Sequence, residues 1–169
     1  MVHYDLDVSG LLSFAPRGAG EILTTGGGTL RFSATTRYFG IALGAAGVAP
    51  NTLALTGGTA RLLRMPIDLD LRGTLRRGRF EGIADVGLVV SILGLSGHGY
   101  IGDRSTTGVN AGIRLSAALR IWLGRVAPFV AAEALIDPMP FDLHAGNTLV
   151  GTTPQLWIGV LAGLAVRIH

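Results

Sequence analysis

Residues 65–73, MPIDLDLRG, alternate between two kinds of side chain along most of their length. Each set occupies every second position; the apolar members are Ile67, Leu69 and Leu71, and the charged members are Asp68, Asp70 and Arg72. Successive side chains of a β-strand point to opposite sides, so this period of two predicts a strand with one apolar and one charged face.

The same period recurs along the whole chain of 169 residues, and helical periodicity is scarce. The predicted strands cover residues 2–14, 29–35, 38–48, 63–73, 79–93, 109–122, 126–136 and 154–168. The predicted connections alternate between long segments, at 15–26, 49–58, 96–106 and 137–153, and short turns near 36–37, 76–78 and 123–125. This alternation predicts one all-β domain over residues 1–169, an eight-stranded antiparallel up-and-down barrel whose two ends differ.

Composition indicates which face of these strands meets water. Only 15% of the residues are charged, whereas soluble surfaces carry about 25–35%, and the mean hydropathy is +0.49. No run approaches the roughly 20 apolar residues of a membrane helix, but strands of about 9–11 residues suffice to cross a bilayer. We therefore expect the apolar parity to face lipid and the polar parity to face the lumen.

On these strands and connections the chain resembles the small outer-membrane β-barrels of the OmpA/OmpX type. The resemblance is architectural and covers essentially the whole chain. It implies a transmembrane barrel in the outer membrane of a Gram-negative bacterium, with short periplasmic turns and longer extracellular loops. The first residues, MVHYDLD, lack a basic segment followed by an apolar one, so an exported chain would have its signal peptide outside this sequence.

The inward parity predicts an ion-pair network, because the lumen of an eight-stranded barrel is only wide enough for side chains. All 14 basic residues are Arg, which suits bidentate pairing with carboxylates. The predicted members are Asp5, Asp7, Arg31, Arg64, Asp68, Asp70, Arg72, Glu81, Asp85, Arg114, Arg120, Glu133 and Arg167, with Asp137 as a further inward acid.

Strand register predicts particular pairs within this network. A turn centred on residues 76–77 places Arg72 opposite Glu81 and Asp68 opposite Asp85, with Arg114 or Arg120 needed between the two acids. A turn centred on residues 123–124 places Arg114 opposite Glu133. Pairing of the last strand with the first brings Arg167 near His3 and Asp5.

Four aromatic residues occupy the apolar parity near the ends of predicted strands, the usual position of an interfacial girdle. Tyr4, Phe39 and Phe80 belong to the short-turn end and Phe14 to the loop end. The arginines near the short turns, Arg76, Arg77, Arg79 and Arg125, either contact anionic lipid headgroups or are solvated.

Other kinds of site receive little support from the residues. The two D-x-D pairs favour a salt-bridged lining over a metal site, since a strand's i and i+2 carboxylates need further ligands, and no open cleft for glycoside hydrolysis is evident. The loop residues His98, Asp103, Ser105, Asp142 and His144 show no nucleophile motif. We expect no catalytic residues, metal or cofactor.

The leading hypothesis is a non-enzymatic structural or surface-binding scaffold, or a very narrow porin-like pore. The alternatives are a membrane-embedded hydrolase or acyltransferase that uses loop His, Asp and Ser residues, and a soluble lipocalin-like carrier. The expected partners are outer-membrane lipids; an extracellular ligand or protein at the loops stays open. We expect a monomer that does not bind nucleic acid, because the arginines are dispersed.

Overall fold

The computed structural model describes residues 2–16, 22–55, 58–98, 105–139, 142–145 and 148–168. No helix long and apolar enough to cross a membrane occurs in these ranges. The strands are β1 (His3–Pro16), β2 (Ile22–Thr35), β3 (Phe39–Leu55), β4 (Gly58–Arg77), β5 (Phe80–His98), β6 (Ser105–Ile121), β7 (Val126–Ile136), β8 (Asp142–Ala145), β9 (Thr148–Thr152) and β10 (Leu156–Arg167).

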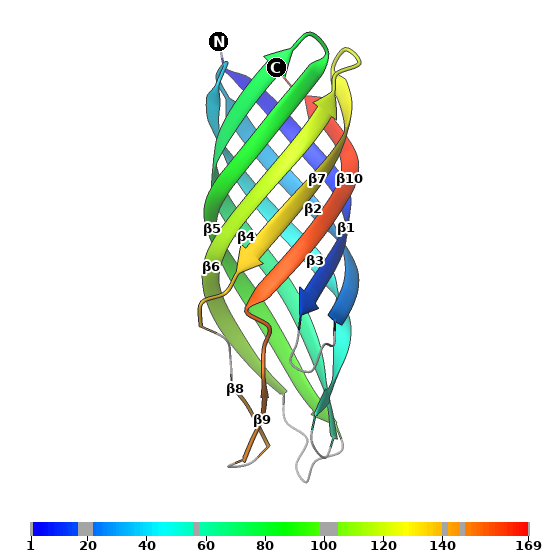
Figure 1. Cartoon of the computed structure of the whole chain (residues 1–169), viewed down its shortest axis with the longest axis vertical. Coiled ribbons are helices and arrows are strands. Elements are labelled where there is room, and N and C mark those ends of the chain that lie inside the picture. Colours follow the sequence, from blue (N-terminus) through cyan, green and yellow to red (C-terminus); the bar gives the residue numbers. More distant parts are fainter. Residues whose placement is uncertain are drawn as a thin grey trace.

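Eight of these strands form a closed antiparallel barrel in the order β1-β10-β7-β6-β5-β4-β3-β2, which confirms the predicted architecture. The first and last barrel strands close the ring, with Asp5 opposite Arg167 and Phe14 opposite Ile158. Figure 1 shows the N- and C-terminal ends at the same end of the barrel as the short connections. We call this the short-turn end and the opposite one the loop end.

The predicted division between apolar and polar faces holds on every barrel strand. Large apolar side chains point outward, as Leu88 (70% exposed) and Leu71 (68% exposed) illustrate, while Asp70 and Arg120 are 1% and 2% exposed. The pleat of each strand enforces this separation, since neighbouring residues must face opposite sides.

The loop end differs from the prediction, because several segments expected to be loops are strand. Residues 49–55 and 58 extend β3 and β4, and residues 96–98 and 105–106 extend β5 and β6. Figure 1 shows these four strands extending past the ends of β7 and β10. Residues 137–153, expected to be a plain connection, contain the β8–β9 hairpin. Backbone hydrogen bonding continues the strands beyond the point where alternation of side chains stops.

The turn between β4 and β5 lies two residues later than predicted. Arg77 pairs with Phe80, so the turn residues are Gly78 and Arg79. Gly78 has φ 62°, a conformation that glycine adopts without steric penalty. The predicted pairing of Arg72 with Glu81 and of Asp68 with Asp85 is therefore wrong, and Arg72 lies opposite Asp85 instead.

Glycine at position 163 permits the close approach of β10 to β1. A Cβ atom added there would lie 2.6 Å from Ser9 Cα, and backbone atoms cannot move aside easily. We expect Gly163→Ala to lower the free energy of unfolding by about 1–3 kcal/mol through overpacking. Urea unfolding of the reconstituted barrel measures the loss. Gly10→Ala on β1 is the matched control, because an added Cβ meets no atom within 4 Å; equal stabilities would contradict the expectation.

Candidate functional site

The candidate site is the barrel interior, where the inward parity gathers the charged side chains predicted for the lumen. Twelve of them are buried, namely Asp5, Asp7, Arg64, Asp68, Asp70, Arg72, Glu81, Asp85, Arg114, Arg120, Glu133 and Asp137. Arg31 and Arg167 are half-buried. All except Arg64 and Asp137 belong to one set of contacts in the short-turn half, described below as the lumen network.

Three arginines from different strands, Arg72, Arg114 and Arg31, hold the carboxylates in the middle of the lumen network. Arg72 donates from Nε and Nη2 to the two Asp85 oxygens at 2.8 and 2.9 Å. Arg114 donates to Glu133 Oε2 from Nε and Nη2, at 3.0 and 2.9 Å, and to Asp70 Oδ2 from Nη1 at 2.6 Å. These charge-assisted contacts neutralise carboxylates that would otherwise be buried without a partner.

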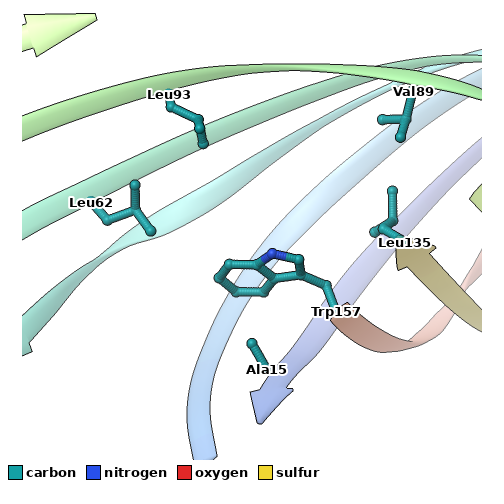
Figure 2. Close-up of a cluster of buried hydrophobic side chains, with 6 residues drawn as sticks. All are labelled: Ala15, Leu62, Val89, Leu93, Leu135 and Trp157. Atoms are coloured by element: carbon teal, nitrogen blue, oxygen red, sulfur yellow. The ribbon is translucent and has the colours of Figure 1, made fainter. Parts of the chain in front are cut away.

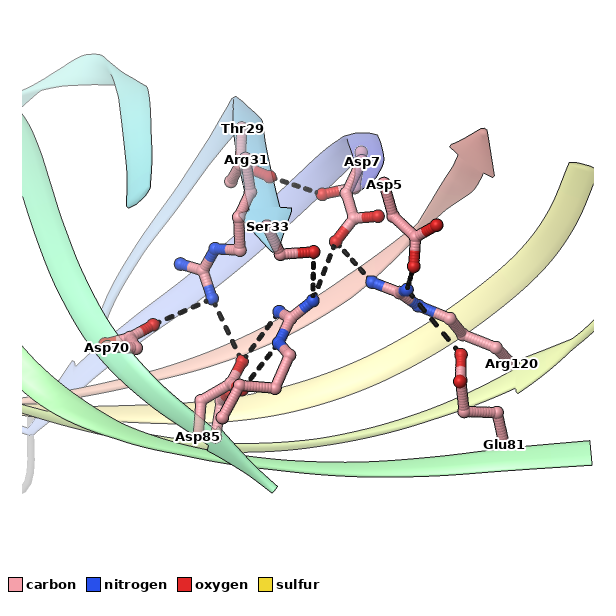
Figure 3. Close-up of polar contacts among 12 residues, drawn as sticks. Asp5, Asp7, Thr29, Arg31, Ser33, Asp70, Glu81, Asp85 and Arg120 are labelled. Carbon is pink, nitrogen blue, oxygen red and sulfur yellow. Dashed lines mark hydrogen bonds and ion pairs between the residues drawn. The ribbon is translucent and has the colours of Figure 1, made fainter. Parts of the chain in front are cut away.

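Arg31 reaches across the lumen from β2 and supplies the neutralising charge for Asp68. Its Nη2 atom lies 2.8 Å from Asp68 Oδ2, while its Nη1 atom lies 3.1 Å from Asp70 Oδ2 and 3.3 Å from Asp85 Oδ2. Figure 3 shows the Arg31 guanidinium extending toward Asp70 and Asp85. The sequence assigned this bridging position to Arg114 or Arg120; Arg114 lies at 4.0 Å from Asp68 and 3.9 Å from Asp85.

A second group of contacts lies nearer the short-turn end. Arg120 contacts Asp7 closely, and its Nη1 atom lies 3.4 Å from Asp5 Oδ2 and 3.7 Å from Glu81 Oε2. Arg167 donates to Asp5 Oδ1 at 2.9 Å, in agreement with the register predicted for it. Figure 3 shows Asp5, Asp7 and Glu81 around the Arg120 guanidinium.

A contact between Arg72 and Asp7 joins the two groups. Trp122, which was not predicted as a site residue, adds a further contact to the group at the short-turn end. Arg72 Nη1 lies 3.7 Å from Asp7 Oδ2, which makes the network continuous. Trp122 Nε1 donates to Glu81 Oε2 at 2.8 Å, and the Arg167 guanidinium lies 4.0 Å from the centre of the Trp122 ring. The position of Trp122 on the inward parity of its strand was the available signal.

The contact between Arg114 and Glu133 forms although the two residues are not directly opposite one another. Glu133 lies opposite Ser116, two positions from Arg114, which itself lies opposite Leu135. The predicted pairing of Arg114 directly opposite Glu133 is therefore wrong, because the turn centre lies one residue later than predicted. The two side chains still meet, since diagonal neighbours across two strands remain within reach of long side chains.

The loop half of the interior contains apolar clusters. One cluster contains Ala15, Leu62, Val89, Leu93, Leu135 and Trp157, and Figure 2 shows the Trp157 indole between Leu62, Leu135 and Ala15. A second, separate cluster contains Leu11, Val48 and Leu161. Arg64 belongs to this half, with its guanidinium 4.5 Å from the Trp157 ring centre and its Nη2 atom 3.8 Å from Asp137 Oδ2. Leucine and tryptophan on the inward parity were the sequence signal for this layer.

The side chains fill the space between the strands closely. A cavity bordered by Arg31, Arg72, Arg114 and Arg120 has a volume of about 30 Å³, which is room for only a small number of water molecules. Along the barrel axis, the lumen network lies toward the short-turn end and the apolar cluster around Trp157 lies toward the loop end. Side chains occupy the interior in both regions.

The predicted girdle aromatics lie on the outside of the barrel. Tyr4, Phe39 and Phe80 are exposed at the short-turn end, and Phe14 is half-buried near the loop end of β1. Tyr4 stacks on Phe32 of β2, with ring centres 6.0 Å apart. Their contact with a membrane interface stays a prediction.

The remaining candidates fall partly outside the described structure. Asp103 lies outside the described residues, and so do the side chains of His98, Ser105, Asp142 and His144. Within the described residues, no three His, Asp or Glu side chains form a group suited to holding a metal ion.

Comparison with known proteins gives structural neighbours only. No family model and no curated protein sequence matches the chain. Among solved structures, a major outer membrane protein from Thermus thermophilus is similar with a TM-score of 0.69, 11% identity and 99% of each chain covered. Neisserial surface protein A gives 0.64, 12% and 96% of each chain. Ail, the attachment invasion locus protein of Yersinia pestis, gives 0.63, 9% and 98% of each chain. The chain therefore has the fold of the small outer-membrane β-barrels.

Proposed function

We propose that this chain is a non-enzymatic scaffold in the outer membrane of a Gram-negative bacterium, with a closed lumen and with its long hairpins displayed at the loop end. The outward apolar side chains support a lipid environment, since water would surround them at high free-energy cost. A soluble carrier of the lipocalin kind would need the opposite arrangement, with apolar side chains around an internal cavity and charges outside.

The filled interior is the observation that favours a scaffold over a pore. Ions entering from the loop end would meet the buried cluster around Trp157, and from the short-turn end the lumen network, where arginines and carboxylates already bind one another. An apolar constriction and a neutralised network both oppose ion passage. The strands β3 to β6 extend furthest at the loop end, and we expect an extracellular partner to bind there.

Planar-bilayer recording tests the closed lumen. We expect the reconstituted protein to give no steady single-channel current at salt concentrations where a sixteen-stranded porin, which encloses an aqueous channel, conducts in the same bilayer. The porin shows that the assay detects open barrels. A reproducible current from the wild-type chain would contradict the scaffold proposal and favour the narrow pore.

Heat-modifiability on a gel tests membrane placement independently of conductance. We expect detergent to be needed for extraction, and the unheated protein to migrate differently from the boiled protein. A chain that stays in buffer as a monomer without detergent, unaffected by heating, would contradict the outer-membrane assignment.

A further inference from the structure

The exposed charge at the short-turn end is entirely positive in the described structure. Arg37, Arg76, Arg77, Arg79 and Arg125 are exposed, and the three short connections contain no acidic residue. The nearest acids lie inside the barrel and are already engaged, as shown by the contacts of Asp5 with Arg167 and of Glu81 with Trp122. Arg37 and Arg76 lie over the rings of Tyr38 and Trp122, and Arg76 Nε donates to Gly78 O. These contacts do not neutralise their charge, which stays available for an anionic partner.

An apolar groove begins on the outer surface at this same end. Outward positions on β4 and β5 carry small residues, Gly73, Gly82 and Ala84, between the protruding side chains of Phe39 and Leu75. Phe39 is 74% exposed and Leu75 is 72% exposed. The resulting groove has a volume of about 540 Å³.

A second apolar groove lies on the next rows of residues toward the middle of the barrel. Phe39, Gly73 and Ala84 lie side by side on three strands. Two residues further along, Ile41, Leu71 and Val86 form the next row, which borders this second groove of about 530 Å³. The two grooves together provide an extended apolar path that starts at the short-turn end.

The arginines lie at the head of this path. Tyr38, Thr74 and Leu75 border both the first groove and an adjoining pocket of about 650 Å³ at the barrel mouth, which Arg37 and Arg76 also line. The guanidinium groups of Arg37 and Arg76 therefore lie at the pocket that adjoins the groove, and Arg77 occupies the next outward position on β4 after Leu75.

We propose that this surface is a binding site for one anionic phospholipid, whose phosphate contacts Arg37, Arg76 and Arg77 and whose acyl chain lies in the groove across β3, β4 and β5. Guanidinium groups bind phosphate strongly, and the groove offers an acyl chain the burial that a free phosphate cannot use. The inference rests on the membrane placement proposed above. It assigns Arg76 and Arg77 to lipid contact rather than to solvation alone.

Lipid selectivity in reconstituted membranes tests the site. Spin-labelled phosphatidylglycerol and phosphatidylcholine are compared in phosphatidylcholine vesicles that contain the protein, and the motionally restricted fraction gives the relative association constant. We expect a preference for phosphatidylglycerol of about threefold to tenfold, since each basic residue near a membrane surface attracts anionic lipid. The triple variant R37Q/R76Q/R77Q should reduce the ratio to about one. Arg61→Gln is the matched control, because Arg61 is an exposed arginine of β4 in the loop half.

A groove-filling variant separates a built site from diffuse attraction. Gly73→Leu with Gly82→Leu keeps every arginine, and added Cβ atoms would meet only Ala84 O at 3.7 Å and Leu75 O at 3.9 Å, which are ordinary contacts. We expect this variant to lose at least about half of the preference. An unchanged preference would overturn the groove, and a wild-type ratio of one would overturn the lipid site and favour an acidic protein partner.

The gel assay distinguishes failure of this site from failure of the proposed function. A heat-modifiable, membrane-embedded wild type without lipid preference contradicts the lipid site alone. A wild type that does not enter vesicles contradicts the membrane placement itself.

Discussion

Replacing Arg114 by methionine is expected to lower the free energy of unfolding by about 3–5 kcal/mol, as does removal of one member of a buried ion pair. Arg114 bonds to Asp70 and Glu133 and lies within 4.0 Å of Asp68 and Asp85. Methionine retains most of the side-chain length but supplies no charge. Three carboxylates, Asp68, Asp70 and Asp85, would then depend on Arg31 and Arg72, and Glu133 would lose both of its hydrogen bonds from Arg114.

Equilibrium urea unfolding in lipid vesicles measures this loss, with the folded fraction read from the unheated gel band. Arg61→Met is the matched control on the exposed surface and should change stability by no more than about 0.5 kcal/mol. The double variant R114M/E133Q should recover part of the loss, because it removes one of the carboxylates left unpaired. An Arg114→Met barrel as stable as the control would contradict a structural role for the lumen network.

Replacing Trp157 by alanine is expected to cost about 3–5 kcal/mol, the range found when a large aromatic residue is removed from a packed interior. Trp157 is 2% exposed and packs against Leu62, Leu135 and Ala15. The change also removes the ring beneath the Arg64 guanidinium and leaves that buried cation with its 3.8 Å contact to Asp137 Oδ2.

The same urea titration measures the effect, and it is followed by the gel band so that the signal does not depend on the replaced tryptophan. Trp157→Phe is the control that keeps an aromatic ring in the layer, and we expect it to retain most of the stability. If the alanine and phenylalanine variants unfold at the same urea concentration, the apolar layer does not contribute through packing around residue 157.

Strand parity explains why most of the architecture could be predicted. In residues 65–73 each side chain must face either the outside or the lumen, so the pattern alone separates Leu69 from Asp70. The long extensions of β3 to β6 carried no such signal, because Gly- and Thr-rich segments pair through the backbone whatever their side chains. The β8–β9 hairpin was missed for the same reason.

The contacts within the lumen were harder to predict from the sequence, and Arg72 shows the cause. Its partner depends on the residues at the turn, and the use of Gly78 with a positive φ shifted the facing residue from Glu81 to Asp85. An error of two residues in the turn centre became an error of four residues in the pairing, since both strands move past one another.

The amino-acid sequence by itself determined the strands, the side of the barrel wall on which each residue lies, and the lumen as the place where buried charges meet. These properties follow from the two-residue repeat of a strand, which is local. Only the tertiary structure decided that Arg31 of β2 neutralises Asp68 of β4, and that Arg120 of β6 contacts Asp7 of β1. Those contacts cross the lumen between strands that are not neighbours, so they depend on the register of every intervening pair and on closure of the barrel.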